Sequence, residues 1–123
     1  MALRIFLCDD AGEVRAYLRD ELEDLDGMEV VGEAAGAADA LAAVAELRPD
    51  VIVLDLGMPE MDGLEALTRL SGTAPDTRVV VYSGFASRRL AGHARRLGAS
   101  AYVEKGAPMA AVEQAIRAAG AGR

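Results

Sequence analysis

The chain has 123 residues, which fits a single domain that can bury its own core. Apolar residues make up 52% of it, which excludes a disordered chain, and its apolar runs are too short to span a membrane. The net charge of −7 argues against nucleic-acid binding by this domain, because such binding needs a basic surface. The chain opens without a signal-peptide pattern, so we expect a cytoplasmic location.

Short apolar runs alternate with helix-like stretches along the whole chain. The runs predict strands at Leu3–Cys8, Met28–Gly32, Val51–Leu54, Arg78–Tyr82 and Ala101–Glu104. The stretches after them predict helices at Glu13–Leu25, Ala37–Leu47, Gly63–Leu70, Ser87–Leu97 and Met109–Ala119. The first helix carries apolar residues at helical spacing, namely Val14, Leu18, Leu22 and Leu25.

The order of these elements defines a fold class. Five strands each followed by a helix predict an α/β protein with a (βα)5, doubly wound parallel sheet and helices on both faces. The strands are apolar along nearly their whole length, which is typical of strands covered on both sides. We assign residues 1–119 to this domain and residues 120–123 to the start of a flexible linker or the end of an expressed fragment.

Reactive side chains follow four of the five predicted strands. The first strand is followed by Asp9 and Asp10, the third by Asp55, the fourth by Ser83, and the fifth by Lys105, the only lysine. The carboxyl ends of parallel strands meet at one edge of the sheet, where open α/β folds bind ligands. We therefore predict one pocket with three carboxylates, a hydroxyl and an ammonium group.

This predicted pocket favours a divalent cation. Three carboxylates close together repel one another, so either some are protonated or a cation neutralises them. Oxygen ligands with room for water and phosphate favour Mg²⁺. We predict Asp10 and Asp55 as direct ligands, Asp9 as a ligand directly or through water, and the backbone carbonyl of Gly57 as a further ligand.

The same residues suit phosphoryl transfer. Asp55 follows the middle strand and is best placed to attack phosphorus and form an aspartyl phosphate. The transferred group carries charge on three equatorial oxygens, for which Mg²⁺, Lys105 and Ser83 are complementary partners. Taken singly, each residue also has a structural interpretation, such as a helix N-cap for an aspartate. Their coincidence at one sheet edge favours the chemical interpretation.

With these residues, the chain resembles the receiver domain of two-component response regulators over essentially its whole length. The resemblance rests on Asp9-Asp10, Ser83, the segment Asp55-Leu56-Gly57-Met58-Pro59-Glu60-Met61-Asp62-Gly63 and the segment Gly98–Lys105. It implies a CheY-like, flavodoxin-like sheet with strand order 2-1-3-4-5. It also implies that Asp55 accepts a phosphoryl group from a histidine kinase in a Mg²⁺-dependent reaction.

The resemblance further implies a switch. Ser83 and Tyr102 would relay phosphorylation to the face formed by the fourth helix, fifth strand and fifth helix. We expect a partner or a second copy of the chain to bind there, giving a homodimer on phosphorylation. The chain would then regulate transcription through an output domain or partner. We expect no enzyme activity beyond assistance to its own phosphorylation and dephosphorylation.

The sequence departs from the family pattern at three positions. Gly106 follows Lys105 where receivers usually have proline, so we predict a trans Lys105–Gly106 peptide, because a non-proline cis bond costs about 3–4 kcal/mol. Gly57 and Phe85 stand two residues after Asp55 and Ser83, where polar residues are common. Neither can orient a hydrolytic water, so we predict slow intrinsic loss of phosphate, with Phe85 shielding the site.

Two other functions remain open from the sequence. One is an aspartate-nucleophile phosphatase, although such enzymes generally need a second Asp where this chain has Gly57. The other is a degenerate receiver that binds a partner without phosphorylation. The C-terminal end resembles receivers that precede a helix-turn-helix domain, which leaves a stand-alone regulator and a fragment both open.

Overall fold

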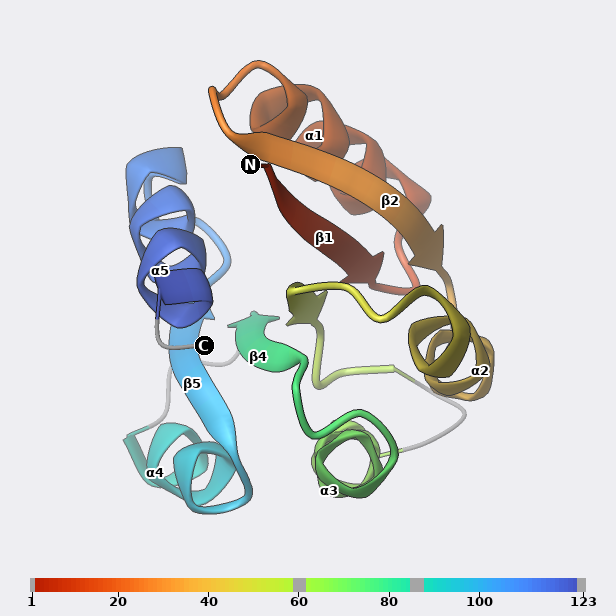
Figure 1. The fold of residues 1–123 in the computed structure, drawn as a ribbon. Helices are drawn as coiled ribbons and strands as arrows, with labels where there is room; N and C mark the ends of the chain where they lie inside the picture. The colour runs from red at the N-terminus through yellow and green to blue at the C-terminus, as the bar shows by residue number, and fades with distance from the viewer. Residues whose placement is uncertain (1, 59–61, 85–87, 122–123) are drawn as a thin grey trace.

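In the computed structural model, which describes residues 2–58, 62–84 and 88–121, five parallel strands form one sheet with the order β2-β1-β3-β4-β5 (Figure 1). The strands are β1 (Leu3–Cys8), β2 (Met28–Ala34), β3 (Val51–Leu54), β4 (Arg78–Ser83) and β5 (Ala99–Glu104). The helices are α1 (Gly12–Glu23), α2 (Ala37–Leu47), α3 (Gly63–Thr73), α4 (Arg88–Arg96) and α5 (Met109–Ala121). The predicted fold class and strand order are confirmed.

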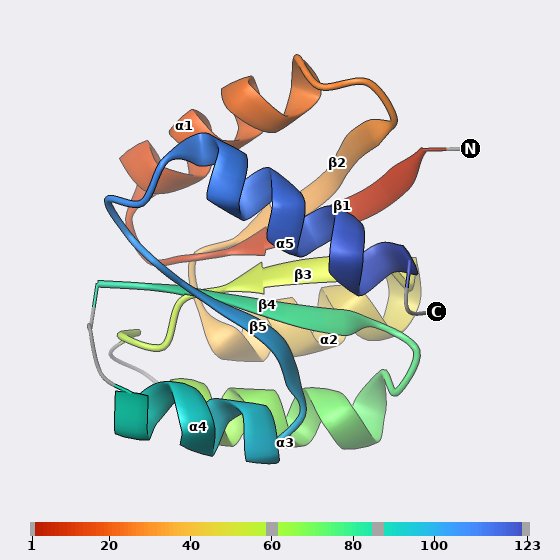
Figure 2. The ribbon, with the colours of Figure 1, turned by 90° about the vertical axis from the view of Figure 1, so that its left-hand side faces the viewer.

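The helices cover both faces of the sheet. Figure 2 shows α1 and α5 on one side and α2, α3 and α4 on the other. Each side has its own core. One, on the α1–α5 side, includes Leu18, Leu22 and Ile116, and the other includes Val44, Leu67 and Ala94. The middle strand β3 is buried along its whole length, which explains its continuous apolar sequence.

Several elements differ from their predicted limits at the ends. The first helix ends at Glu23, before the predicted end at Leu25, because the Leu25 N–H bonds to the Leu22 carbonyl in a tighter turn. Strand β2 runs to Ala34, past the predicted end at Gly32, because its last residues pair with the end of β1. The start predicted for the fourth helix, Ser87, lies outside the described residues, and the described helix begins at Arg88.

The last helix is also longer than predicted. It continues past Ala119 to Ala121, so Gly120 lies in the helix. A Cβ at Gly120 would come within 2.6 Å of Leu3 Cδ2, so glycine lets the end of α5 pack closely on the first strand. Among the described residues, no helix has the length and apolarity needed to cross a membrane.

Candidate functional site

The carboxyl edge of the sheet brings the predicted site residues together through backbone hydrogen bonds that continue beyond the strands. The Asp55 N–H donates to the Cys8 carbonyl at 2.9 Å, and the Lys105 N–H donates to the Ser83 carbonyl at 2.7 Å. The Asp9 N–H donates to the Ala34 carbonyl at 3.2 Å. The segments that follow β1, β3 and β5 are therefore fixed to their neighbouring strands.

Three carboxylates meet at this edge. Asp9, Asp10 and Asp55 each place one oxygen within 4.8 Å of the other two. Asp9 and Asp55 are buried, at 3% and 5% exposed, whereas Asp10 is exposed. A cluster of oxygen donors with one open side is the donor set that suits Mg²⁺, which keeps several water ligands. The residues present thus fit the metal that the sequence predicted.

Lys105 lies between two of these carboxylates. Its Nζ is 2.8 Å from Asp9 Oδ2 and 3.6 Å from Asp55 Oδ2. Burial alone would lower the pKa of this ammonium group, but the hydrogen bond to Asp9 and the charge of Asp55 outweigh it, so the pKa of Lys105 is raised. Lys105 therefore stays protonated and adds a fixed positive charge to the pocket.

The two carboxylate oxygens of Asp55 have different partners. Its Oδ1 accepts the Gly57 N–H at 3.2 Å, while its Oδ2 faces Lys105. Burial raises the pKa of Asp55, the Gly57 hydrogen bond opposes that rise, and the charge of Asp9 adds to it. A cation in the cluster would stabilise the ionised carboxylate that an attack on phosphorus requires.

Ser83 and Tyr102 lie on the same face of the sheet. Val81 pairs with Tyr102 across β4 and β5, and both contact the core on the α2–α4 side. Ser83 follows Val81 by two residues, so it points to that same face. Ser83 is fully buried at the end of β4, and Tyr102 is half-buried. The two residues of the predicted relay therefore share one face of the sheet.

The loop after β5 departs from the family pattern without strain. None of the described peptide bonds is cis, so the predicted trans Lys105–Gly106 bond is confirmed. Gly106 has φ +101°, a conformation open to glycine. Gly57 is exposed beside Asp55, but Phe85 lies outside the described residues.

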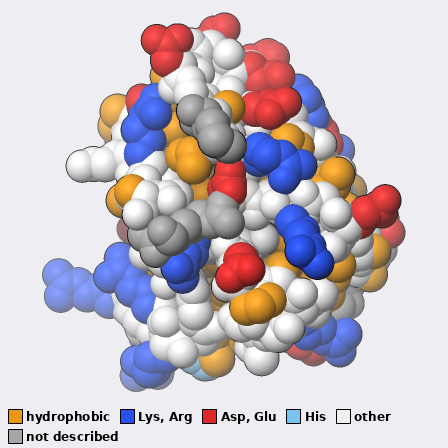
Figure 3. Space-filling view, viewed as in Figure 1, with side chains coloured by type: hydrophobic (Ala, Val, Ile, Leu, Met, Phe, Trp, Pro, Cys, Tyr) orange, Lys and Arg blue, Asp and Glu red, His pale blue; other side chains and the backbone are white. Residues whose placement is uncertain are grey.

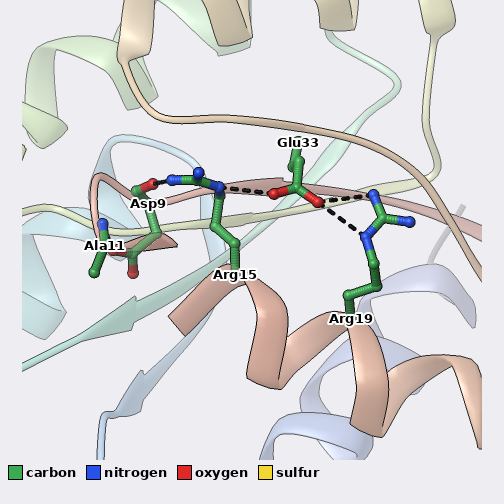
Figure 4. Close-up of polar contacts among 5 residues, drawn as sticks. All are labelled: Asp9, Ala11, Arg15, Arg19 and Glu33. Carbon is green, nitrogen blue, oxygen red and sulfur yellow. Dashed lines mark hydrogen bonds and ion pairs between the residues drawn. The ribbon is translucent and has the colours of Figure 1, made fainter. Parts of the chain in front are cut away.

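Sequence reasoning missed one group beside the acidic cluster. Arg15 on α1 donates from Nη1 to the Asp9 carbonyl at 2.6 Å and contacts Glu33 on β2 through Nε at 2.8 Å (Figure 4). Arg19 contacts the other Glu33 oxygen at 2.8 Å. These contacts join residues that are 6 to 18 positions apart, so no local sequence pattern could show them.

A parallel (βα)5 sheet with three carboxylates and a lysine at its carboxyl edge defines a CheY-like α/β domain. Residues 5–117 match the model of the response regulator receiver domain, and the chain belongs to that family. Aspartate phosphorylation and Mg²⁺ binding are typical of the family.

The curated relatives are longer proteins than this chain. The chain is 36% identical over 121 residues to the response regulator GacA of Pseudomonas viridiflava, covering 98% of this chain and 56% of that protein. It is 39% identical over 115 residues to a protein-glutamate methylesterase/protein-glutamine glutaminase of Trichodesmium erythraeum, covering 92% of this chain and 33% of that protein. The chain therefore spans about half the length, or less, of these curated relatives.

The fold also closely matches a solved structure. A LuxR-family two-component response regulator from Aurantimonas sp. SI85-9A1 superposes with a TM-score of 0.94 at 36% identity, covering 100% of this chain and 88% of that chain. The similarity includes the complete sheet and its helices.

Proposed function

We propose that this domain is a phosphorylation-operated switch in which Asp55 accepts a phosphoryl group from a histidine kinase. The observation that carries the proposal is the meeting of Asp9, Asp10 and Asp55 within 4.8 Å, with Lys105 bonded to one buried carboxylate and close to another. A charge-dense pocket at the end of a buried sheet is costly to maintain without a function for it.

The transfer requires one bond to form and one to break. An Asp55 oxygen attacks phosphorus, the bond from phosphorus to the kinase imidazole nitrogen breaks, and the imidazole leaves with the electron pair and takes up a proton. Bound Mg²⁺, held by Asp9, Asp10, Asp55 and the Gly57 carbonyl, would supply positive charge for the transferred oxygens. Lys105 Nζ, 3.6 Å from Asp55 Oδ2, is close enough to move onto a phosphoryl oxygen.

Signal transmission would run through Ser83 and Tyr102. The aspartyl phosphate adds negative charge and strong acceptor oxygens beside Ser83. If Ser83 Oγ turns toward the phosphoryl group, Tyr102 on the same face can rotate inward. The surface of α4, β5 and α5 would then change, and a partner or second copy would bind there.

Figure 3 shows basic side chains over the α4 region, and the last turn of α4 contains His93, Arg95 and Arg96. That face therefore suits an acidic partner surface.

The output is proposed at a coarser level. We propose control of transcription through a further domain or a partner in the cytoplasm, because relatives are named as a response regulator and as a transcriptional regulatory protein. The methylesterase relative shows that similar receivers also occur in proteins named for an enzyme activity. For this domain, phosphatase turnover is disfavoured because Gly57 supplies no side chain for acid–base catalysis.

Phosphorylation by a small donor tests the proposal. The protein is incubated with acetyl phosphate with and without Mg²⁺, and its intact mass is measured. We expect a gain of one phosphoryl group that requires Mg²⁺ and is absent in Asp55→Asn. Asp76→Asn is the matched control, since Asp76 is exposed and precedes β4 at the opposite edge of the sheet.

The other outcomes separate the alternatives. Continuous release of inorganic phosphate without accumulation of the phosphorylated chain would support a phosphatase. No mass gain in a folded protein that binds Mg²⁺ would favour a degenerate receiver. Slow loss of the phosphoryl group after removal of the donor is expected, because neither Gly57 nor Phe85 carries a side chain that orients water.

A further inference from the structure

We propose that Arg15 is a positioning residue for the metal centre, which clamps the peptide group between Asp9 and Asp10 and so fixes the Asp10 carboxylate. The inference rests on the proposed Mg²⁺-dependent function. Arg15 contacts no atom of the reacting groups in the described structure, and it acts through the main chain of the acidic pair.

Asp9 is held by four separate contacts. Its N–H bonds to the Ala34 carbonyl, its Oδ1 accepts the Ala11 N–H at 2.9 Å, and its Oδ2 contacts Lys105. The fourth contact is from Arg15 Nη1 to the Asp9 carbonyl at 2.6 Å. The Ala11 N–H bond closes a turn over Asp10, and the Arg15 contact is the one among the described contacts that holds the carbonyl of the Asp9–Asp10 peptide.

Asp10 depends on that peptide. The Asp9 carbonyl and the Asp10 N–H and Cα lie in one plane, because the peptide bond is rigid. Holding the carbonyl oxygen therefore sets the position of the Asp10 Cα. Asp10 is exposed, and no hydrogen bond of its carboxylate is found among the described contacts. Together with the turn closed by the Ala11 N–H, the clamp thus holds the exposed Asp10 carboxylate within 4.8 Å of Asp9 and Asp55.

Arg15 is held in place by an ion pair with Glu33. Glu33 on β2 accepts Arg15 Nε through Oε1 at 2.8 Å, and its Oε2 accepts Arg19 Nε at 2.9 Å. Figure 4 shows the row Asp9, Arg15, Glu33 and Arg19 running from the acidic loop along α1 and β2. Only an arginine presents several donors in a rigid fork, so it can hold the carbonyl and the carboxylate together.

Charge and positioning make opposite predictions for Arg15. If only its positive charge mattered, its removal would strengthen Mg²⁺ binding, since a repulsive neighbour is lost. If it positions Asp10, the same removal weakens Mg²⁺ binding. The sign of the change therefore distinguishes the two roles.

The test is a titration of the whole chain with Mg²⁺ at constant ionic strength. Binding is monitored in ¹H–¹⁵N nuclear magnetic resonance spectra. For Arg15→Gln we expect about a tenfold loss of affinity, the lower end of the range for removing an outer-shell partner. The Asp10 amide signal should also shift before Mg²⁺ is added. Arg15→Lys keeps the charge but not the fork, so it should weaken binding in the same direction. Glu33→Gln should give a smaller loss.

The matched controls are Arg69→Gln and Glu65→Gln, which alter an exposed ion pair of 2.7 Å on α3 and change the net charge by the same amounts. They should leave Mg²⁺ affinity unchanged. Stronger binding in Arg15→Gln, or wild-type affinity in Arg15→Lys, would overturn the inference while leaving the proposed function intact. If Arg15→Gln does not fold, Arg15→Lys decides. A wild-type protein that binds no Mg²⁺ would instead overturn the metal requirement of the proposed function.

Discussion

Asp55 is held as a buried acid in a pocket that already contains another buried carboxylate. Its side chain is only 7% exposed, and burial raises its pKa above the ordinary value. A carboxyl group with a higher pKa in the folded than in the unfolded state binds its proton more tightly when folded. At neutral pH the ionised group therefore lowers the free energy of unfolding of the metal-free protein.

Asp55→Asn should accordingly stabilise the protein in the presence of EDTA. We expect a gain of about 1 kcal/mol at pH 7, which corresponds to a melting temperature higher by ~4 °C for a domain of this size. As the pH falls through the raised pKa, wild-type Asp55 takes up its proton and the difference between the two proteins should shrink. Thermal melts followed by circular dichroism from pH 7 to pH 4 check this. A less stable variant, or a difference independent of pH, would contradict it.

Cys8 should be chemically inert in the folded protein. Its side chain lies at the end of β1, is 1% exposed, and contacts Met58 Sδ at 3.4 Å. Burial, followed by the charges of Asp9 and Asp55, raises the pKa of the thiol to about 12. The thiolate is the reactive form, so both its accessibility and its population are very low at pH 8.

Ellman's reagent measures this directly. At pH 8 we expect no reaction with the native protein over the time in which a protein unfolded in guanidinium chloride releases one equivalent of thionitrobenzoate per chain. Prompt stoichiometric reaction of the native protein would show that the end of β1 opens readily. Such opening would also disturb the positions of Asp9 and Asp10, which directly follow β1.

At the scale of elements, the start of α3 shows why a glycine is needed where this helix packs against the loop after Asp55. A Cβ on Gly63 would lie 2.3 Å from Leu56 Cα and 2.7 Å from Leu56 O, both in the backbone. The helix is capped just before, where Asp62 Oδ1 accepts the Leu64 N–H at 2.9 Å. The close approach of helix and loop thus leaves no room for a side chain.

Two glycines of the same helix should therefore respond in opposite directions. Gly63→Ala should lower the free energy of unfolding by about 1–3 kcal/mol, because the backbone must move to accept the methyl group. Gly72→Ala, where nothing lies within 4 Å of the new Cβ, should raise it by about 0.5–1 kcal/mol through the better helix propensity of alanine. Urea unfolding at pH 7 measures both. Equal effects would contradict the close contact at Gly63.

The elements also show how far sequence alone predicts this fold. The ranges of β1, α2 and β3 match the predicted ranges, because continuous apolar strands and a helix ended by Pro49 leave clear local signals. The ends of β2 and α5 differ from the prediction by two residues each, because they are set by tertiary contacts such as that between Gly120 and Leu3. The end of α1 also differs by two residues, because a tight turn at Leu25 closes the helix early. Local patterns do not contain these contacts.

The site follows the same division. Asp9, Asp10, Asp55 and Lys105 meet as predicted, because the topology of a parallel sheet alone brings the carboxyl ends of β1, β3 and β5 to one edge. The clamp by Arg15 could not be predicted, since it depends on how the side of α1 lies against β2. Sequence thus predicts which side chains gather at this edge, and only the structure shows what holds them in place.

At the scale of the whole molecule, three tyrosines sample three different environments. Tyr17 is exposed on α1, Tyr82 is buried on the α1–α5 side with its ring centroid 6.0 Å from Lys105 Nζ, and Tyr102 is half-buried on the α2–α4 side. A switch that runs through Ser83 should change the environment of Tyr102 most. The other two rings serve as internal references for the same experiment.

Fluorotyrosine labelling can therefore follow the switch across the molecule, with the three ¹⁹F signals assigned through single Tyr→Phe variants. On addition of acetyl phosphate and Mg²⁺, we expect the Tyr102 signal to move most, because inward rotation takes its ring from partial exposure into the core. The Tyr82 signal should move less, as Lys105 shifts toward the phosphoryl group, and the Tyr17 signal should stay in place. Ser83→Ala should reduce the Tyr102 change relative to the phosphorylated fraction measured by intact mass. An unchanged Tyr102 signal in a fully phosphorylated chain would exclude the relay and direct attention to the loop that carries Lys105 as the route of transmission.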